Sequence, residues 1–352
     1  MKTLIHIIPT LENGGAETVL ARLVEEFSKN DIKQFVITSQ GATTDFHYAA
    51  INKYATILDW KKNHEGVEQI LLLNRKVPII AWMYPAILLV HKLKYRLKTD
   101  NSIFWNIRHS SFRWNQIYQK LALFAFSFYS HLKQPKIIYC SYRAKEVHEI
   151  YFFPKKNSVV IQNRLAKKQD LSQLVANKTD EKSEPFFLYV GRYDPIKGPK
   201  RLVQITRTFF LENPEINLKI AGSGWTIDKI PKQIRERVFL LGNVKNIFPL
   251  YRTAKALLFT SHAEGYPNVL VEAIVSGTPI IGFEAGDSKL ILDNYKFGYS
   301  IKTLSEFINK LSFVLDNSIS KTEKNEEIVR QQKQLDFKVT VQEYLCFLEQ
   351  NT

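Results

Sequence analysis

Two glutamates, Glu264 and Glu272, lie eight positions apart in the stretch SHAEGYPNVLVEA, residues 261–273. The stretch follows an apolar run, 254–260, that is typical of a strand, and Asn268 is predicted to be the N-cap of the next helix. Glu272 then lies one turn into that helix, while Glu264 precedes it. Carboxylates so placed can accept sugar hydroxyls on both sides of a helix N-terminus that faces a diphosphate. A salt-bridged pair on a surface turn is the alternative.

A second stretch, GRYDPIKG at residues 191–198, places two cations directly after a predicted strand, 186–190. Arg192 can hold two phosphate oxygens in its planar fork, and Lys197 adds a point charge. Two such cations suit a diphosphate. Two solvated charges on a loop are the alternative.

Glycines mark two further turns after predicted strands. Gly14 and Gly15 stand in PTLENGGAE, and Gly222 and Gly224 stand in AGSGW. A residue without a Cβ lets backbone N–H groups approach a phosphate or a flat base, although Gly-Gly before a helix is also a common tight turn. The chain has neither a GxGxxG that follows a strand and opens a helix nor a P-loop, which argues against a dinucleotide dehydrogenase and a P-loop kinase.

Strand-like and helix-like patterns alternate along the chain, which predicts an α/β protein with parallel sheets covered on both faces. Apolar residues at helical spacing in 16–29, for example, follow a strand at 3–8. The predicted strands are 3–8, 34–39, 78–84, 102–107, 135–141, 159–163, 186–190, 217–221, 238–242, 254–260 and 279–283. The predicted helices are 16–29, 67–76, 86–98, 114–132, 199–213, 226–236, 246–253, 268–277 and 339–350.

The length of 352 residues fits two domains. A polar stretch at 166–185 is interpreted as the linker region. We therefore expect one domain over 1–175, a second over 176–335, and a C-terminal helix within 336–352 that could pack on either. The only two cysteines, Cys140 and Cys346, show no metal-ligand spacing, which favours a reducing, cytoplasmic setting. No segment reads as a signal peptide or as a membrane span.

Taken together and in this order, these stretches resemble glycosyltransferase family 4, whose members are retaining enzymes of the GT-B fold with a Glu-x7-Glu segment. Glu264 and Glu272 fit that spacing, and LGNVKNI at 241–247 and GTPII at 277–281 add to the similarity. The resemblance implies two Rossmann-like domains whose parallel sheets face an interdomain cleft. The N-terminal domain would bind the acceptor, and the C-terminal domain would bind a nucleotide-sugar donor.

The resemblance also implies roles for single residues. Catalysis would fall to four of them, with Arg192 and Lys197 neutralising the diphosphate in place of a metal, Glu264 contacting the transferred sugar, and His109 touching that sugar from the acceptor side. A buried structural histidine is the alternative for His109. Glu272 would bind the ribose. The remaining donor-binding positions would be Gly14, Gly15, Gly222, Gly224, Asn243, Val244, Gly265, Tyr266, Pro267, Asn268 and Val269. The chain departs from the family pattern at EAGDSKLI, 284–291, and at Asn163–Arg164.

The net charge of +15 is concentrated in the first half, where residues 1–175 contain 25 Lys and Arg against 13 Asp and Glu. Such an excess suits an anionic surface. Basic and aromatic residues mix in 86–98 and 111–133, which favours docking on an anionic membrane more than insertion into it. This also fits the polyprenyl-linked saccharide acceptors that such bacterial transferases commonly use.

We therefore expect a metal-independent retaining glycosyltransferase with no cofactor, at the inner face of the cytoplasmic membrane. It would transfer a sugar from a UDP-hexose or UDP-N-acetylhexosamine to a lipid-linked saccharide in the synthesis of lipopolysaccharide, capsule or another surface polysaccharide. A GDP-mannose-dependent transferase and a nucleotide-sugar epimerase of the same fold are the alternatives. A nucleic-acid-binding protein fits poorly, because the aromatic residues stand in apolar runs and no nucleic-acid motif is present.

Overall fold

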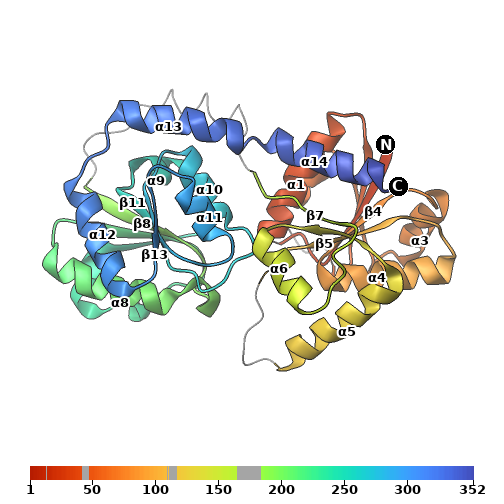
Figure 1. Cartoon of the computed structure of the whole chain (residues 1–352), viewed down its shortest axis with the longest axis horizontal. Coiled ribbons are helices and arrows are strands. Elements are labelled where there is room, and N and C mark those ends of the chain that lie inside the picture. Colours follow the sequence, from red (N-terminus) through yellow and green to blue (C-terminus); the bar gives the residue numbers. More distant parts are fainter. Residues whose placement is uncertain (13, 42–46, 109, 111–116, 165–183) are drawn as a thin grey trace. The chain divides into compact units, whose positions relative to one another are not determined.

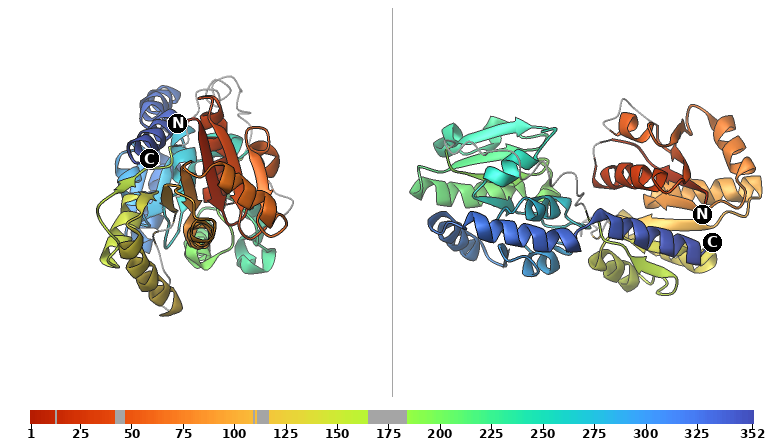
Figure 2. Two further views of the ribbon diagram at one scale, coloured as in Figure 1. Left: turned by 90° about the vertical axis from the view of Figure 1, so that its right-hand side faces the viewer. Right: turned by 90° about the horizontal axis from the view of Figure 1, so that it is seen from above.

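The computed structural model describes residues 1–352 apart from 13, 42–46, 109, 111–116 and 165–183. The chain divides into two compact units. The first comprises Met1–Asn163 together with Lys338–Thr352, and the second comprises Arg164–Phe337. Most of the predicted linker region lies outside the described residues. Each unit is a parallel sheet with helices on its faces (Figures 1 and 2), so the predicted α/β architecture of two Rossmann-like domains is confirmed.

The first unit contains a seven-stranded sheet with the order β3-β2-β1-β4-β5-β6-β7, in which every described strand pair is parallel. Its strands are β1 (Thr3–Ile8), β2 (Lys33–Thr38), β3 (Thr56–Asp59), β4 (Ile79–Trp82), β5 (Ile103–Ile107), β6 (Lys136–Tyr139) and β7 (Ser158–Val160). Its helices are α1 (Gly15–Ser28), α2 (Tyr48–Ile51), α3 (His64–Leu73), α4 (Met83–Leu97), α5 (Ile117–Lys133), α6 (Tyr142–Ile150) and α14 (Phe337–Gln350).

Helix α1 shows why the sequence folds in this way. Its apolar positions recur three and four residues apart, and this stripe is fully buried against the sheet at Val19, Leu20, Leu23, Val24 and Phe27. The stripe follows β1, whose last five residues are also buried. A buried strand followed by a helix with one apolar face is the repeating unit of a parallel sheet, as the periodicity predicts.

The C-terminal helix α14 packs on the first unit beside α1 (Figure 1). The hydroxyl of the fully buried Tyr344 accepts a hydrogen bond of 2.9 Å from Asn106 on β5, and its ring packs edge-on against Phe27 of α1. Thr340 donates a hydrogen bond of 2.9 Å to the carbonyl of Gln162. This helix is therefore part of the core of the first unit.

The second unit contains a six-stranded sheet with the order β10-β9-β8-β11-β12-β13. Its strands are β8 (Phe186–Val190), β9 (Asn217–Ala221), β10 (Val238–Gly242), β11 (Ala256–Phe259), β12 (Ile280–Phe283) and β13 (Gly298–Ile301). Its helices are α8 (Pro199–Glu212), α9 (Phe248–Thr253), α10 (Asn268–Val275), α11 (Ser288–Asp293), α12 (Leu304–Asp316) and α13 (Lys321–Gln334), with the short 3-10 turns η1 (Pro195–Lys197), η2 (Ile227–Lys229) and η3 (Lys232–Arg237).

The strand order of each sheet indicates where a ligand is expected to bind. In the second unit the chain runs outward from β8 through β9 to β10 and then returns to β11 on the other side of β8. In the first unit the same reversal lies between β1 and β4. The loops that leave the carboxyl ends of two such strands diverge to opposite faces of the sheet, and the space between them is where open α/β sheets bind ligands.

Two local predictions are wrong. The predicted helix 226–236 is instead the two 3-10 turns η2 and η3, because Pro231 stands between them and a proline inside a helix removes a backbone donor and clashes with the preceding turn. Asn268 is the first helical residue of α10, and the N-cap is Pro267, whose backbone is extended. Proline fits the N-cap here because the helix start has no use for its missing N–H.

Candidate active site

The loops after β8 and β11 are fastened together at the reversal point of the second sheet. Gly198 has a left-handed φ of 68°, and a Cβ there would lie 2.0 Å from the carbonyl oxygen of Thr260. The Thr260 hydroxyl donates to the carbonyl of Lys197 at 3.0 Å, and the backbone N–H of His262 donates to that of Ile196 at 2.8 Å. The two loops therefore form one rigid surface.

Local sequence places Lys197 on this surface. The Asp194 carboxylate caps the turn η1 by accepting from the N–H of Ile196 at 2.9 Å, and Pro195 fixes the first residue of the turn. Gly198 then ends the turn and begins α8. The Asp-Pro-x-x-Gly order thus forces Lys197 to the end of a single tight turn above the sheet.

Lys197 and Glu264 form the central contact of the site. The ammonium Nζ lies 2.7 and 2.9 Å from the two carboxylate oxygens, and Ser261 donates a third hydrogen bond to Oε1 at 2.6 Å. Only 11% of the Glu264 side chain and 26% of the Lys197 side chain are exposed. Because both charges are largely shielded from water, each holds the other in a fixed position.

Arg192 follows β8 directly and has an exposed side chain, with no hydrogen bond or ion pair from it among the described residues. Its backbone packs tightly against the β9 loop. Gly222 has φ of 145°, and a Cβ there would lie 2.2 Å from the carbonyl oxygen of Gly191, which also accepts from the indole N–H of Trp225 at 3.0 Å. Gly224 has φ of 81°. These glycines let the loops after β8 and β9 meet.

Glu272 lies on the second turn of α10, and a carboxylate oxygen accepts from the hydroxyl of Tyr251 at 3.1 Å. Tyr251 is fully buried, and this burial, with the nearby Glu272 charge, raises the pKa of its phenol well above the usual value. The phenol therefore stays protonated and remains a hydrogen-bond donor. A hydrogen bond from a buried donor holds the carboxylate in a fixed position, which suits it to accept from a ligand hydroxyl.

The other residues of the second unit that are predicted from the sequence to bind the sugar donor lie on the same edge of the sheet. Asn243 and Val244 directly follow β10, whose Gly242 carbonyl accepts from the N–H of Gly222 at 2.7 Å. The loop before α10 is pressed against the β12 loop, since a Cβ on Gly286 would lie 2.4 Å from the carbonyl oxygen of Glu264. This loop and the first turn of α10 contain Gly265, Tyr266, Pro267, Asn268 and Val269.

The first unit holds the other predicted positions. Gly14 is the N-cap of α1 and Gly15 its first residue, at the carboxyl end of β1. The nearly buried Glu17 folds back over Gly14, where a Cβ would lie 2.2 Å from its carboxylate oxygen. A side chain at position 14 would therefore have to displace the Glu17 side chain, and a ligand contact at Gly14 stays a prediction. His109 lies outside the described residues. Its neighbour Arg108 stacks over Trp82 and donates to Asn163 at 2.5 Å.

Sequence reasoning missed the residues that support the two glutamates. Ser261 stands three positions before Glu264 in the same stretch, and its hydroxyl could have been considered a local partner. Tyr251 gives no such signal, because it lies 21 positions before Glu272 on a separate helix. Sequence reasoning also assigns no role to Arg201 of α8, which is not among the contacts of either glutamate described above. Its guanidinium packs over Phe283 of β12 at 4.5 Å, and burial lowers its pKa.

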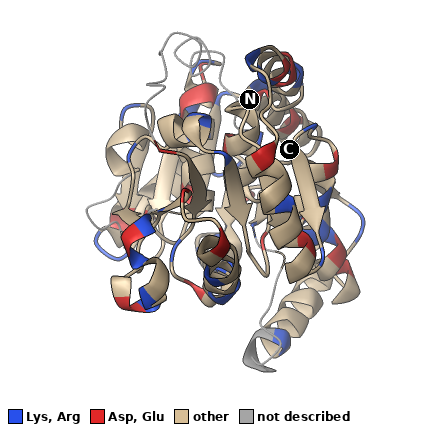
Figure 3. Ribbon diagram, turned by 90° about the vertical axis from the view of Figure 1, so that its left-hand side faces the viewer, with Lys and Arg blue, Asp and Glu red and all other residues tan. Residues whose placement is uncertain are grey.

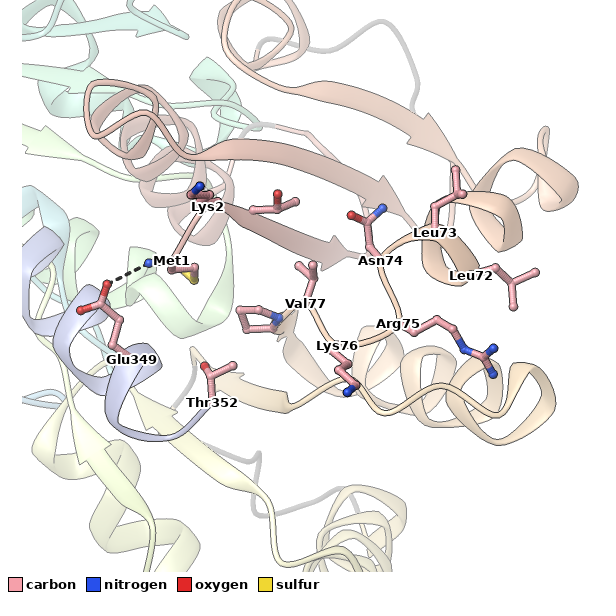
Figure 4. Close-up of a pocket in the computed structure, with 12 residues that line it drawn as sticks. Met1, Lys2, Leu72, Leu73, Asn74, Arg75, Lys76, Val77, Glu349 and Thr352 are labelled. Carbon is pink, nitrogen blue, oxygen red and sulfur yellow. Dashed lines mark hydrogen bonds and ion pairs between the residues drawn. The ribbon is translucent and has the colours of Figure 1, made fainter.

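A cavity of about 740 Å³ in the first unit lies away from all these residues. Its lining includes Thr3 and Pro78 at the starts of β1 and β4, together with the Met1 amino group, which pairs with Glu349 at 3.2 Å (Figure 4). Ligands of open parallel sheets bind at the opposite, carboxyl ends of the strands. This cavity is therefore not part of the candidate site.

Among the residues that the structure describes, no group of three or more His, Cys, Asp or Glu side chains has the arrangement of a metal site. None of the described helices combines the length and apolar character needed to cross a bilayer.

Comparison with known proteins finds relatives of the second unit. Residues 170–335 match the family model described as glycosyl transferases group 1. The serotype-specific mannosyltransferase WbdA of Escherichia coli is 31% identical over 106 residues, which are 28% of this chain and 13% of that protein. The N-acetyl-alpha-D-glucosaminyl L-malate synthase of Bacillus anthracis is 26% identical over 160 residues, 44% of this chain and 40% of that protein. The chain thus spans well under half of these relatives.

Solved structures share the fold of the whole chain. Anabaena Alr3699/HepE, in complex with UDP and glucose, covers 99% of this chain and 100% of its own with a TM-score of 0.75 at 15% identity. The lipopolysaccharide outer core galactosyltransferase WaaB, in its apo form, covers 96% and 97% with a TM-score of 0.68 at 19% identity. The chain therefore has the GT-B architecture, and residues 170–335 are similar to glycosyl transferases group 1.

Proposed function

We propose that the protein is a retaining glycosyltransferase that takes a sugar from a nucleotide diphosphate-sugar. The observation that carries this proposal is the fixed Lys197–Glu264 pair at the reversal point of a glycosyltransferase domain, with the exposed Arg192 on the same loop. A cation held beside a carboxylate, with a second cation left open to solvent, suits a ligand that carries both a diphosphate and sugar hydroxyls.

In this proposal the second unit binds the sugar donor. Arg192 and Lys197 contact the diphosphate, and the N–H groups at the start of α10 face its oxygens. Glu272, fixed by Tyr251, accepts the ribose hydroxyls, and the backbone at Asn243 and Val244 meets the base. The glycines at 222 and 224 allow the close approach. Glu264 accepts hydroxyls of the transferred sugar, so that its anomeric carbon is oriented relative to the two cations.

The reaction breaks the bond between the anomeric carbon and the diphosphate oxygen and forms a bond from that carbon to the acceptor hydroxyl oxygen. The acceptor attacks from the face that the nucleotide leaves, and its proton passes to the departing diphosphate. Charge accumulates on the diphosphate, so fixed cations stabilise the transition state more than the ground state. The proposal keeps a catalytic role for His109 and a phosphate contact for the backbone of Gly15.

We infer a UDP-hexose or UDP-N-acetylhexosamine as the sugar donor. Support comes from the shared fold of Alr3699/HepE, whose structure contains UDP and glucose, and from the EGYPNVL sequence. GDP-mannose is the second candidate, because WbdA, which is named a mannosyltransferase, matches this chain at 31% identity. No metal and no cofactor would be required, because the two cations supply the charge that a divalent ion would bring.

The acceptor in this proposal is a saccharide, carried on a polyprenyl lipid at the cytoplasmic face of a bacterial membrane. The product would be a surface glycan such as capsule or lipopolysaccharide. Relatives of the same fold include transferases named for lipopolysaccharide synthesis, WaaB and WaaG. The basic first half of the chain suits an anionic membrane surface.

The test is to incubate the full chain with UDP-glucose, UDP-galactose, UDP-N-acetylglucosamine, UDP-N-acetylgalactosamine and GDP-mannose, and to measure released UDP or GDP. One donor should be turned over, by slow hydrolysis or by transfer to added saccharides, equally with and without EDTA. The anomeric configuration of the product, read by NMR, should match that of the donor. Failure to bind or turn over any donor contradicts the proposal, and an altered sugar still joined to its nucleotide identifies an epimerase instead.

A further inference from the structure

Helix α5 (Ile117–Lys133) is apolar on two opposite faces, and only one of them is covered within the first unit. The inner face packs on the sheet, where Phe126 and Tyr129 contact the buried Trp105 and Leu123 is 1% exposed. The outer face is open, with exposures of 60%, 50%, 69% and 66% at Leu121, Phe124, Phe128 and Leu132. Their spacing of three, four and four residues makes one continuous stripe.

The stripe continues onto the segment after α6. Phe152 has a left-handed φ of 65°, which is unfavourable for a side chain of this size, and the aromatic ring is 65% exposed. It lies beside Phe124, with ring centroids 6.2 Å apart, and Phe124 also meets Tyr151 edge-on at 5.6 Å. Ile150 is 62% exposed. We call Leu121, Phe124, Phe128, Leu132, Ile150 and Phe152 the α5 patch.

The chain segments that form and adjoin the α5 patch carry an excess of positive charge. Helix α5 contains no acidic residue (Figure 3), and its neighbour α4 contains none either. The acids within residues 117–156 are Glu146 and Glu149, and each is paired with a cation of α6. The cations of residues 83–98 and 117–156 are Lys92, Lys94, Arg96, Lys98, Lys120, Lys133, Lys136, Arg143, Lys145, Lys155 and Lys156.

Helix α4 presents a similar stripe next to α5. Leu88 is 53% exposed and Tyr95 is 87% exposed, with the exposed Lys92 between them on the same face. The two helices touch through His91 and Tyr129, whose rings are 5.3 Å apart. Exposed apolar side chains and lysines thus occur on both of these neighbouring helices.

We propose that the α5 patch inserts into the interfacial layer of an anionic lipid bilayer. Phe and Leu side chains would enter the boundary between headgroups and acyl chains, while the surrounding lysines stay among the lipid phosphates. A helix of 17 residues with this pattern lies in the plane of the interface. A second copy of the chain fits poorly, because pairing two α5 patches would bring like charges together. This inference deepens the membrane contact in the proposed function and does not depend on the sugar donor.

The test is sedimentation of the full chain with phosphatidylglycerol-containing vesicles and with pure phosphatidylcholine vesicles, without any nucleotide-sugar. The chain should bind the anionic vesicles. The double variant Phe124→Ser/Phe128→Ser should bind these vesicles at least roughly tenfold more weakly, because it lacks two apolar side chains that leave water when the wild type binds. The matched control is Leu72→Ser/Leu73→Ser on α3, where the side chains are 43% and 78% exposed but lie outside the α5 patch. It should bind like the wild type.

A second experiment measures an increase in fluorescence on binding, so that loss of binding by an unfolded variant cannot be mistaken for support. In a Cys346→Ser background, with Cys140 buried, Phe128→Cys labelled with an environment-sensitive fluorophore should brighten and shift to the blue on anionic vesicles. The same label at Leu73→Cys should not. The proposal is overturned if the wild type ignores anionic vesicles, if Phe124→Ser/Phe128→Ser binds them unchanged, or if the label at 128 stays in water. It is also overturned if ultracentrifugation shows a dimer that only Phe124→Ser/Phe128→Ser abolishes.

Discussion

Replacing Lys197 by methionine tests the central contact of the site. The ammonium lies 2.7 and 2.9 Å from the carboxylate oxygens of Glu264, whose side chain is 11% exposed. Methionine keeps most of the length and apolar stem of the side chain and removes the charge. If Lys197 contacts the leaving diphosphate, its loss should lower kcat by about 10²–10³-fold, the usual effect of removing one fixed group that stabilises developing charge.

The cost in stability should be smaller. Breaking a fully buried ion pair costs about 3–5 kcal/mol, and an exposed pair contributes about 0.2–1 kcal/mol. This pair is intermediate in exposure, so we expect the free energy of unfolding to fall by about 2 kcal/mol. A domain with an ordinary stability of roughly 5–15 kcal/mol stays folded after that loss. Unfolding therefore cannot account for a hundredfold loss of activity.

The assay is steady-state release of the nucleotide from whichever sugar donor the protein uses, with denaturant unfolding of the same samples. Lys200→Met is the matched control, because Lys200 is exposed on the first turn of α8, and it should retain kcat within about twofold of the wild type. The reasoning is refuted if Lys197→Met keeps kcat within about threefold. It is also refuted if Lys197→Met/Glu264→Gln is no slower than Glu264→Gln alone, since Lys197 would then only position the glutamate.

Three further changes have defined outcomes. Tyr251→Phe removes the buried donor to Glu272, and should raise KM for the sugar donor several-fold while costing about 1–2 kcal/mol in unfolding free energy; an unchanged KM would contradict the ribose role. Gly198→Ala should lower the free energy of unfolding, measured by denaturant titration, by at least about 2 kcal/mol. The control Gly242→Ala, with a similar φ of 62° but no atom within 4 Å of the new Cβ, should lower it by about 1 kcal/mol. Equal losses would show that φ alone matters. Burial lowers the pKa of His6 to about 4 from its usual 6.5, so the unfolded chain binds more protons at this residue between those values, and His6 alone should lower the free energy of unfolding by about 3 kcal/mol from pH 7 to pH 4. His6→Gln should lose most of this contribution to the pH dependence.

The fold follows from the sequence because periodicity records which face of each element is buried. The stripe of α1 and the apolar strands on either side of it suffice to predict a covered parallel sheet. Prediction fails where one residue overrides the pattern, as Pro231 does in the predicted helix 226–236. It also misses the short β3 at Thr56–Asp59, whose residues are not fully buried and so lack a clear apolar signal.

The site is less accessible to sequence reasoning than the fold. Spacing predicts that Glu264 and Glu272 flank the start of a helix, and this holds. The partners of these glutamates come from elsewhere, since Lys197 is 67 positions from Glu264 and Tyr251 is 21 positions from Glu272. The Lys197–Glu264 contact depends on β8 and β11 being neighbours, which is set by strand order. Periodicity within single elements carries no information about that order.

The return of α14 to the first unit affects the order in which the two units can be completed during synthesis. The first unit lacks a buried part of its interior, including Tyr344, until residues 338–352 leave the ribosome. The second unit has all its residues by position 337. The first unit is therefore completed after the second, and Asn106 and the face of α1 lack their contacts with α14 while residues 164–337 are translated.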